Sequence, residues 1–172
     1  LVSPILGNED KAVEHVSLTL KHLARVQSEE LTNALKEPIR HLLKSVEISK
    51  QMLGLDAVGK LKIQGLRNEV LPLFDNTSSS EMIRLYMSAL NNQPIENKET
   101  FIKLSKMETL EVELRASAVQ TVAIADVKAA NNILATWVPQ LDLEQKKKVI
   151  NLMANSKEGS KLLKLLLDEG LI

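Results

Sequence analysis

The sequence contains no cysteine, few aromatic residues, no excess of either charge and no long apolar run. Without cysteine, these residues cannot form a disulfide, ligate zinc through thiolates, act by thiol catalysis or attach a c-type haem covalently. Aromatic residues make up only 2% of the 172 residues, which leaves no stacking platform for single-stranded nucleic acid. Lys and Arg together number 22, as do Asp and Glu, so the charge balance favours neither nucleic acid nor an anionic membrane as a partner.

The longest apolar run, "LLKLLL" at 162–167, is interrupted by Lys164 and is too short to span a bilayer. We therefore expect no membrane insertion. The first residue is Leu1 and the opening "LVSPIL" resembles part of a helix, so we expect a fragment or a processed form of a longer protein. The cellular location stays open. No segment has the composition of a flexible linker, so we expect a single domain over residues 1–172.

Apolar residues recur at helical spacing along nearly the whole chain, which predicts about ten helices and no strand. Val13, Val16 and Leu20 show this spacing near the start. The segment "EPIRHLLKSVEISKQML" (37–53) repeats it, and Pro38 suits a first helical turn. We expect one face of that segment to carry Ile39, Leu42, Leu43, Val46 and Met52. Residues 56–74 are harder to assign because Gly59 and Gly65 lie within them.

Capping residues mark several helix ends. The N-caps expected from the sequence are Asn8 or Asp10, one of Ser78 to Ser80, Thr109, Asp126, Asp142 and Ser156. Pro139 is expected to end a helix, and Gly170 is expected to follow the last one.

The helices group into pairs over 1–25, 28–53, 56–92, 97–124 and 126–155, with 157–168 as a partner or cap. Pairs of this length with short connections predict an all-α solenoid of antiparallel helix pairs. The small residues at 88–90 and 116–119 would let neighbouring helices approach closely. "RASAVQTVAIA" (115–125) is small and aliphatic nearly all round, as expected of a helix with neighbours on both sides.

The stretch "LPLFDNTSSSEMIRLYMSAL" (71–90) resembles a HEAT repeat, in which a turn with an acidic residue precedes a helix that begins with Val-Arg and small residues. Asp75, Ile83, Arg84 and Ala89 carry the resemblance. Residues 1–24 are similar, with Val13 in place but Glu14 where arginine is usual. Residues 28–70 depart most from the pattern and leave the repeat register open. The resemblance implies a HEAT- or armadillo-like architecture.

The last third, including "ILATWVPQLDLEQKKKVINLMANSKEGSKLLKLLLDEGLI" (133–172), resembles the HEAT-like segment of large bacterial dehydrogenase-like proteins. The residues that carry it are Arg115, Ala118, Trp137, Leu141, Val149, Leu152, Leu162, Leu163, Gly170 and Ile172. In those proteins a quinoprotein-type propeller precedes the helical segment and a c-type cytochrome domain follows it. The resemblance implies a periplasmic oxidoreductase parent, with the haem-attachment Cys-x-x-Cys-His beyond this segment.

Few residues qualify as candidates for a functional site. His15 and His22 lie seven residues apart and could share a metal only with a third ligand, so surface histidines are the favoured interpretation. Glu111 and Glu113 cannot point the same way on one helix, which disfavours a paired-carboxylate site. "QKKK" (145–148) is interpreted as a solvated face. We expect no catalytic residue, metal or cofactor here. The candidates for packing or interaction are Arg84, Arg115 and Trp137.

Trp137, the only tryptophan, is interpreted first as a core residue and second as a binding hot spot. The favoured function is a non-catalytic scaffold or spacer that presents helices to a protein or to adjoining domains. One alternative is a stand-alone protein-binding adaptor, which would expose a patterned stripe on its inner helices. Another is a closed helical bundle that binds a small ligand or acts as an enzyme, which would contain a sizeable pocket.

Overall fold

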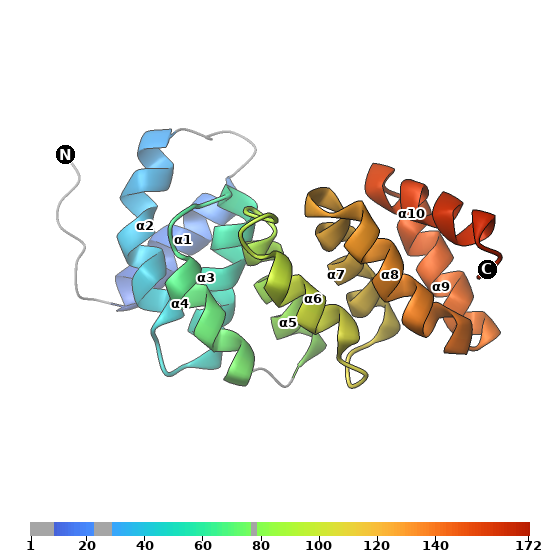
Figure 1. Cartoon of the computed structure of the whole chain (residues 1–172). Coiled ribbons are helices and arrows are strands. Elements are labelled where there is room, and N and C mark those ends of the chain that lie inside the picture. Colours follow the sequence, from blue (N-terminus) through green and yellow to red (C-terminus); the bar gives the residue numbers. More distant parts are fainter. Residues whose placement is uncertain (1–8, 23–28, 77–78) are drawn as a thin grey trace. The chain divides into compact units, whose positions relative to one another are not determined.

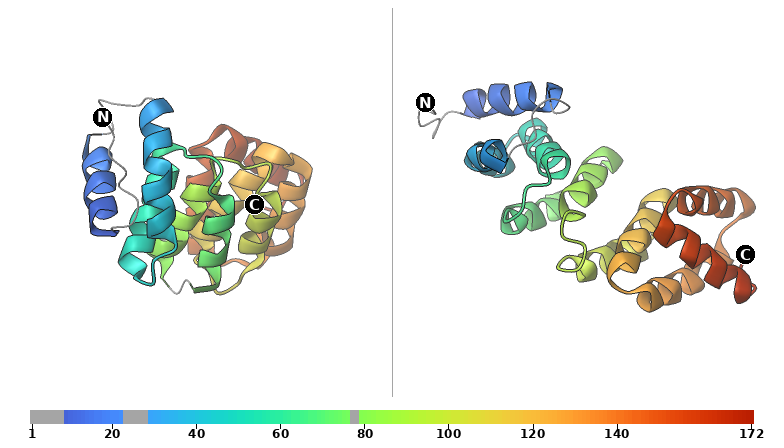
Figure 2. Two further views of the ribbon diagram at one scale, coloured as in Figure 1. Left: turned by 90° about the vertical axis from the view of Figure 1, so that its left-hand side faces the viewer. Right: turned by 90° about the horizontal axis from the view of Figure 1, so that it is seen from above.

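The computed structural model describes residues 9–22, 29–76 and 79–172 (Figure 1). Within these ranges the protein is all-helical, and every described segment is drawn as a coiled ribbon or a connection, without strands (Figure 2). The α-helices are α1 (Glu9–Lys21), α2 (Glu29–Leu43), α3 (Ile48–Leu61), α4 (Arg67–Val70), α5 (Ser80–Leu90), α6 (Lys98–Lys106), α7 (Val112–Ala125), α8 (Val127–Trp137), α9 (Leu143–Ala154) and α10 (Lys157–Asp168). Two short 3₁₀ helices are η1 (Leu71–Asn76) and η2 (Val138–Gln140). The predicted all-α class and the predicted number of helices are confirmed.

The chain divides into two compact units, Leu1–Asn92 and Gln93–Ile172. Each has its own buried apolar core, as expected when amphipathic helices cover one another's apolar sides. The expectation of one domain over the whole chain stays a prediction. No helix of the described residues is both long enough and apolar enough to cross a membrane.

In the first unit, α3 is the central helix and packs against α1, α2 and α5. Leu55 and Val58 of α3 are buried there together with Tyr86 of α5. Gly59 allows the close approach of α3 and α5, because a Cβ at this position would collide with Ser88. Glycine in a helix interior costs roughly 1 kcal/mol relative to alanine. Tertiary packing explains why Gly59 is nevertheless within α3.

The prediction for 37–53 is wrong in two respects. Helix α2 begins at Glu29, where two acidic residues favour the first turn, so Pro38 lies inside the helix. Proline there removes one backbone hydrogen bond, but Pro38 is buried on the apolar side of α2 together with Ile39. The second error concerns Val46, which lies in the turn between α2 and α3 and is 97% exposed.

The α2–α3 turn is held by side-chain hydrogen bonds that the apolar spacing does not indicate. The Ser45 hydroxyl accepts from the Glu47 N–H at 3.3 Å, and the Gln51 amide donates to the Ser45 carbonyl at 2.7 Å. Serine commonly competes with helical bonding in this way. The chain therefore reverses after Leu43, and α2 and α3 pack against each other instead of forming one long helix.

In the second unit, α7 is the central helix and packs against α6, α8, α9 and α10. Alternate helices also touch, α7 with α9, α8 with α6 and α8 with α10. The buried residues of α7 are Val112, Leu114, Ala116, Ala118, Val119, Thr121, Val122 and Ala123. They surround most of the helix, which agrees with the prediction from its small, aliphatic composition.

Most predicted caps are found. Ser79, Asp126, Asp142 and Ser156 each accept from a backbone N–H three residues ahead, and Asp142 forms a reciprocal capping box with Gln145. Gly170 follows the C-cap of α10 with φ +67°. Thr109 was expected to cap α7, but α7 begins at Val112 because Met107–Leu110 form a separate turn. Asp10 lies inside α1, and Asn8 lies outside the described residues.

Candidate functional site

Two of the three candidate residues, Arg115 of α7 and Trp137 of α8, lie in contact within the second unit. The guanidinium carbon of Arg115 is 4.5 Å from the centroid of the Trp137 ring, which is a cation–π geometry. The Arg115 Nε donates to the carbonyl of Ser105 in α6 at 3.1 Å. Arg115 therefore connects α6, α7 and α8 through one side chain.

Burial governs the electrostatics of this pair. Desolvation lowers the pKa of the Arg115 guanidinium from its ordinary value, and the nearby charge of Glu108 opposes the effect. The cation persists at neutral pH because an arginine does not lose its proton in proteins. Trp137 is only 6% exposed, and its Nε1 has no hydrogen-bond partner among the described residues. This is the environment of a packing residue with one unsatisfied donor.

Arg84, the third candidate, lies in the first unit on α5, where it is exposed. Its neighbours Ile83 and Met82 are buried, so the helix turns its apolar side inward and carries Arg84 outward. Arg84 therefore does not belong to the Arg115–Trp137 contact.

His15 of α1 and His22, in the turn directly after α1, are both exposed. In the described part of the chain, no group of three or more metal-ligating side chains is placed to hold a metal ion. The apolar side of α1 buries Ala12 and Val16 instead, and His15 remains exposed beside it.

The charged residues of α7 and α9 form ion pairs. Glu113 pairs with Lys148 at 3.0 Å, and Glu144 pairs with Lys147 at 2.9 Å. The Glu113 carboxylate raises the pKa of the Lys148 ammonium. Because the lysines of 146–148 are half-buried or exposed and two of them are paired, the segment has the character of a solvated helix side.

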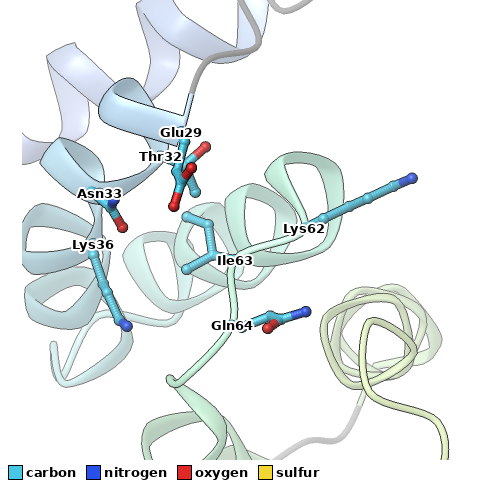
Figure 3. Close-up of a pocket in the computed structure, with 7 residues that line it drawn as sticks. All are labelled: Glu29, Thr32, Asn33, Lys36, Lys62, Ile63 and Gln64. Atoms are coloured by element: carbon cyan, nitrogen blue, oxygen red, sulfur yellow. The ribbon is translucent and has the colours of Figure 1, made fainter.

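A polar pocket of about 260 Å³ lies between α2 and the turn after α3 (Figure 3). It is lined by Glu29, Thr32, Asn33, Lys36, Lys62, Ile63 and Gln64. Lys62 adopts the left-handed conformation, with φ 53°, which is unfavourable for residues other than glycine. The Ile63 N–H donates to the Val58 carbonyl across this turn, a pattern typical of helix C-termini.

The polar side chains of this pocket do not converge on one point. Figure 3 shows the Lys62 side chain extending away from Glu29 and Thr32, and the ammonium groups of Lys36 and Lys62 lie far apart in this view. The volume is below the roughly 300–1,000 Å³ of common small-molecule sites. We therefore assign no catalytic group to it. No local sequence signal marks this pocket, since its lining comes from α2 and from the turn after α3, which meet only in the fold.

A second pocket, of about 410 Å³, lies near α4 in the first unit. Its lining residues are Leu43, Lys44, Gln51, Asn68, Glu69, Pro72 and Leu73. Two of its polar groups already have intramolecular partners. Glu69 accepts from Arg40 Nε at 2.7 Å, and Gln51 donates to the Ser45 carbonyl. The hydrogen bonds that Arg40 donates to Glu37 and to Glu69 raise the pKa of its guanidinium.

Comparison with models of known protein families, with curated proteins and with solved structures finds no match for this chain. The resemblance to HEAT repeats and to the helical segment of dehydrogenase-like proteins therefore rests on the residues quoted above. It stays a prediction.

Proposed function

We propose that this chain is a non-catalytic α-solenoid scaffold or spacer that presents helix faces to a protein or to adjoining domains. The packing of alternate helices carries the proposal. In the second unit α7 packs on α9, and α8 packs on both α6 and α10. In the first unit α3 packs on α1 and on α5 in the same alternate fashion. Stacked helix pairs produce this pattern, because each pair contacts the pairs before and after it.

The last helix supports the same proposal. Helix α10 buries Gly159, Leu162 and Leu166 on one side and exposes Lys157, Lys161 and Lys164 on the other. Terminal helices of a repeat array need such a polar outer side, since no further repeat covers them. The same amphipathic pattern suits any surface helix, so α10 adds to the proposal without carrying it.

The proposal also places this chain in a longer parent protein, and this part of the proposal rests on the resemblance alone. In a periplasmic dehydrogenase-like protein, this segment would space a propeller domain from a haem domain, and electron transfer would belong to those domains. Sequencing the gene beyond Ile172 tests this context. A Cys-x-x-Cys-His motif within the next few tens of codons would support it, and a stop codon there would contradict it.

Two alternatives remain as competing proposals. A stand-alone adaptor would bind a protein through the same helix faces without any attached domain. A closed bundle that binds a small ligand would need a pocket with converging polar groups. The two pockets described above have partnered or diverging polar groups, so the scaffold is favoured over the bundle.

In-cell photo-crosslinking tests the scaffold. A photoreactive residue would replace Asn132 of α8, Asn151 of α9 or Ser160 of α10, all exposed positions of the second unit. We expect protein adducts of discrete mass from some positions and none from others, since a scaffold presents a defined face. Absence of adducts at all three positions, together with a small molecule retained by the purified protein, would favour the ligand-binding alternative.

A further inference from the structure

The outer sides of α6, α8 and α10 carry a set of exposed lysines. They are Lys103 and Lys106 on α6, Lys128 on α8, and Lys157, Lys161 and Lys164 on α10. We name these residues the lysine face. On α10 the spacing of four and then three residues places its lysines along one stripe, and the spacing of three does the same on α6.

Helix packing brings the three lysine-bearing helices together in the second unit. Helix α7 packs against α6, α8 and α10, and α8 contacts both α6 and α10. Each of the three helices buries the side opposite its lysines, with Phe101 on α6, Leu134 on α8 and Leu162 on α10. The lysines therefore lie on the sides turned away from the core around α7.

The lysine face differs in its pairing from three other lysines of this unit. Lys98 lies 3.6 Å from Asp126, Lys147 lies 2.9 Å from Glu144, and Lys148 lies 3.0 Å from Glu113. In the described ranges, no ammonium group of the lysine face has an ion-pair or hydrogen-bond partner. Carboxylates near these stripes lie at the helix ends, at Glu99 of α6, at the α8 N-cap Asp126, and at Glu158 and Asp168 of α10.

We propose that the lysine face binds an acidic segment of a protein partner, with carboxylates that complement its unpaired ammonium groups. The proposal names the partner class for the scaffold function and rests on that function. Charge complementarity carries it, because neighbouring unpaired cations repel one another and a carboxylate-rich partner relieves this repulsion.

The composition of the face favours a protein over nucleic acid. It contains lysine but no arginine, whose planar fork is suited to phosphate, and no exposed aromatic ring for base stacking. The whole chain has as many acidic as basic residues, so it lacks the long-range attraction of nucleic-acid-binding domains.

Fluorescence anisotropy with labelled poly-L-glutamate and the full chain tests the proposal at low ionic strength. The test variant is K106Q/K128Q/K161Q, which removes one ammonium from each helix of the face. The matched control is K146Q/K147Q/K148Q on α9, which changes the net charge equally on a different helix. Exposed pairs contribute little individually, so we expect the test variant to weaken binding by about tenfold and the control by less than about threefold.

Equal weakening by the two variants, or no measurable binding by the unsubstituted chain, would overturn the proposal. Tighter binding of a thymidine oligonucleotide or of anionic vesicles, with the same sensitivity to K106Q/K128Q/K161Q, would also overturn it in favour of those ligands. Binding to poly-L-glutamate should disappear at roughly 0.5 M salt, where screening is strong. A negative result leaves the crosslinking test of the scaffold unaffected, because that test uses positions on three helices and requires no acidic partner.

Discussion

At the residue scale, the Arg115–Trp137 contact carries two costs, which the attraction of the cation to the ring and the burial of the indole offset. The guanidinium gives up hydration as it packs between α6, α7 and α8, and the indole N–H is buried without a partner. The ring face attracts the cation, and such contacts contribute about 0.5–2 kcal/mol depending on burial. The remaining stabilisation comes from the apolar area of the indole, since Trp137 is almost fully buried.

Replacing Trp137 by alanine should lower the free energy of unfolding by about 3–5 kcal/mol, as is usual for a large buried ring. Urea unfolding followed by far-ultraviolet circular dichroism measures this, because the variant loses the fluorescent residue. Trp137→Phe is the control: it keeps a ring for Arg115 and should cost less. An unchanged urea midpoint combined with the loss of crosslinked adducts would instead support a binding hot spot.

Asp126 makes the stability of the fold depend on pH in the acid range. Its carboxylate accepts from the Ala129 N–H at 2.9 Å and lies 3.6 Å from Lys98, and both interactions lower its pKa below the ordinary 3.8. A lowered pKa in the folded state contributes stability above the ordinary value, and this contribution is lost as the pH falls through the lowered one. The charged form is therefore the stabilising one.

Asp126→Asn removes this titration but keeps an N-cap oxygen. We expect the variant to be less stable than the unsubstituted chain at neutral pH, and the difference to shrink as the pH falls below about 3.8. Urea midpoints measured across the acid range check this. A difference that stays constant with pH would mean that the carboxylate charge does not contribute.

At the element scale, the α9–α10 turn depends on contacts from another helix. The Gln120 amide of α7 donates to the Leu152 carbonyl at 3.2 Å and to the Ser156 hydroxyl at 3.0 Å. Ser156 accepts in turn from the Gly159 N–H at 2.9 Å as the N-cap of α10. Gly159 is buried among these groups, and a Cβ on it would collide with the Met153 carbonyl and approach Gln120 Nε2 to 2.7 Å.

Gly159→Ala should therefore destabilise the second unit, although alanine is the better helix former. Overpacking against backbone costs about 1–3 kcal/mol, which exceeds the roughly 1 kcal/mol that alanine gains in a helix. Gly170→Ala is the control, because its Cβ would meet no atom within 4 Å and only the positive φ opposes it. Thermal unfolding of both variants measures the difference. A more stable Gly159→Ala protein would show that the α9–α10 packing accommodates the added methyl group.

At the scale of the whole molecule, the chain contains two compact units with separate cores. Tyr86 and Leu55 belong to the first core, and Val119 and Leu134 belong to the second. In repeat arrays, stability is close to a sum over neighbouring repeats, so parts of an array often fold independently.

Residues 1–92 and 93–172, produced separately, should each give helical circular dichroism and a cooperative urea transition. A fragment of residues 93–155 serves as the comparison, because it lacks α10 and exposes the apolar residues that Leu162 and Leu166 cover. That fragment should have a lower urea midpoint than 93–172. If neither half folds alone, the two units depend on each other for stability.

Local signals in the sequence determined the helical class and many helix ends. Apolar spacing of three and four residues specifies helices directly, and Asp126, Asp142 and Ser156 cap helices through bonds to backbone three residues away. The composition of 115–125 also indicated a helix surrounded by neighbours. Each of these signals is contained within a few consecutive residues, which is why it can be read without coordinates.

The tertiary structure decided what depends on residues far apart in the chain. The helix break at Val46, the position of Pro38 inside α2 and the need for glycine at 59 and 159 follow from which helices pack together. The same holds for Arg115 on Trp137 and for the gathering of unpaired lysines on α6, α8 and α10. The spacing of apolar residues indicates which side of a helix is apolar. Only the packing of those sides against one another determines which polar residues meet and which remain exposed together.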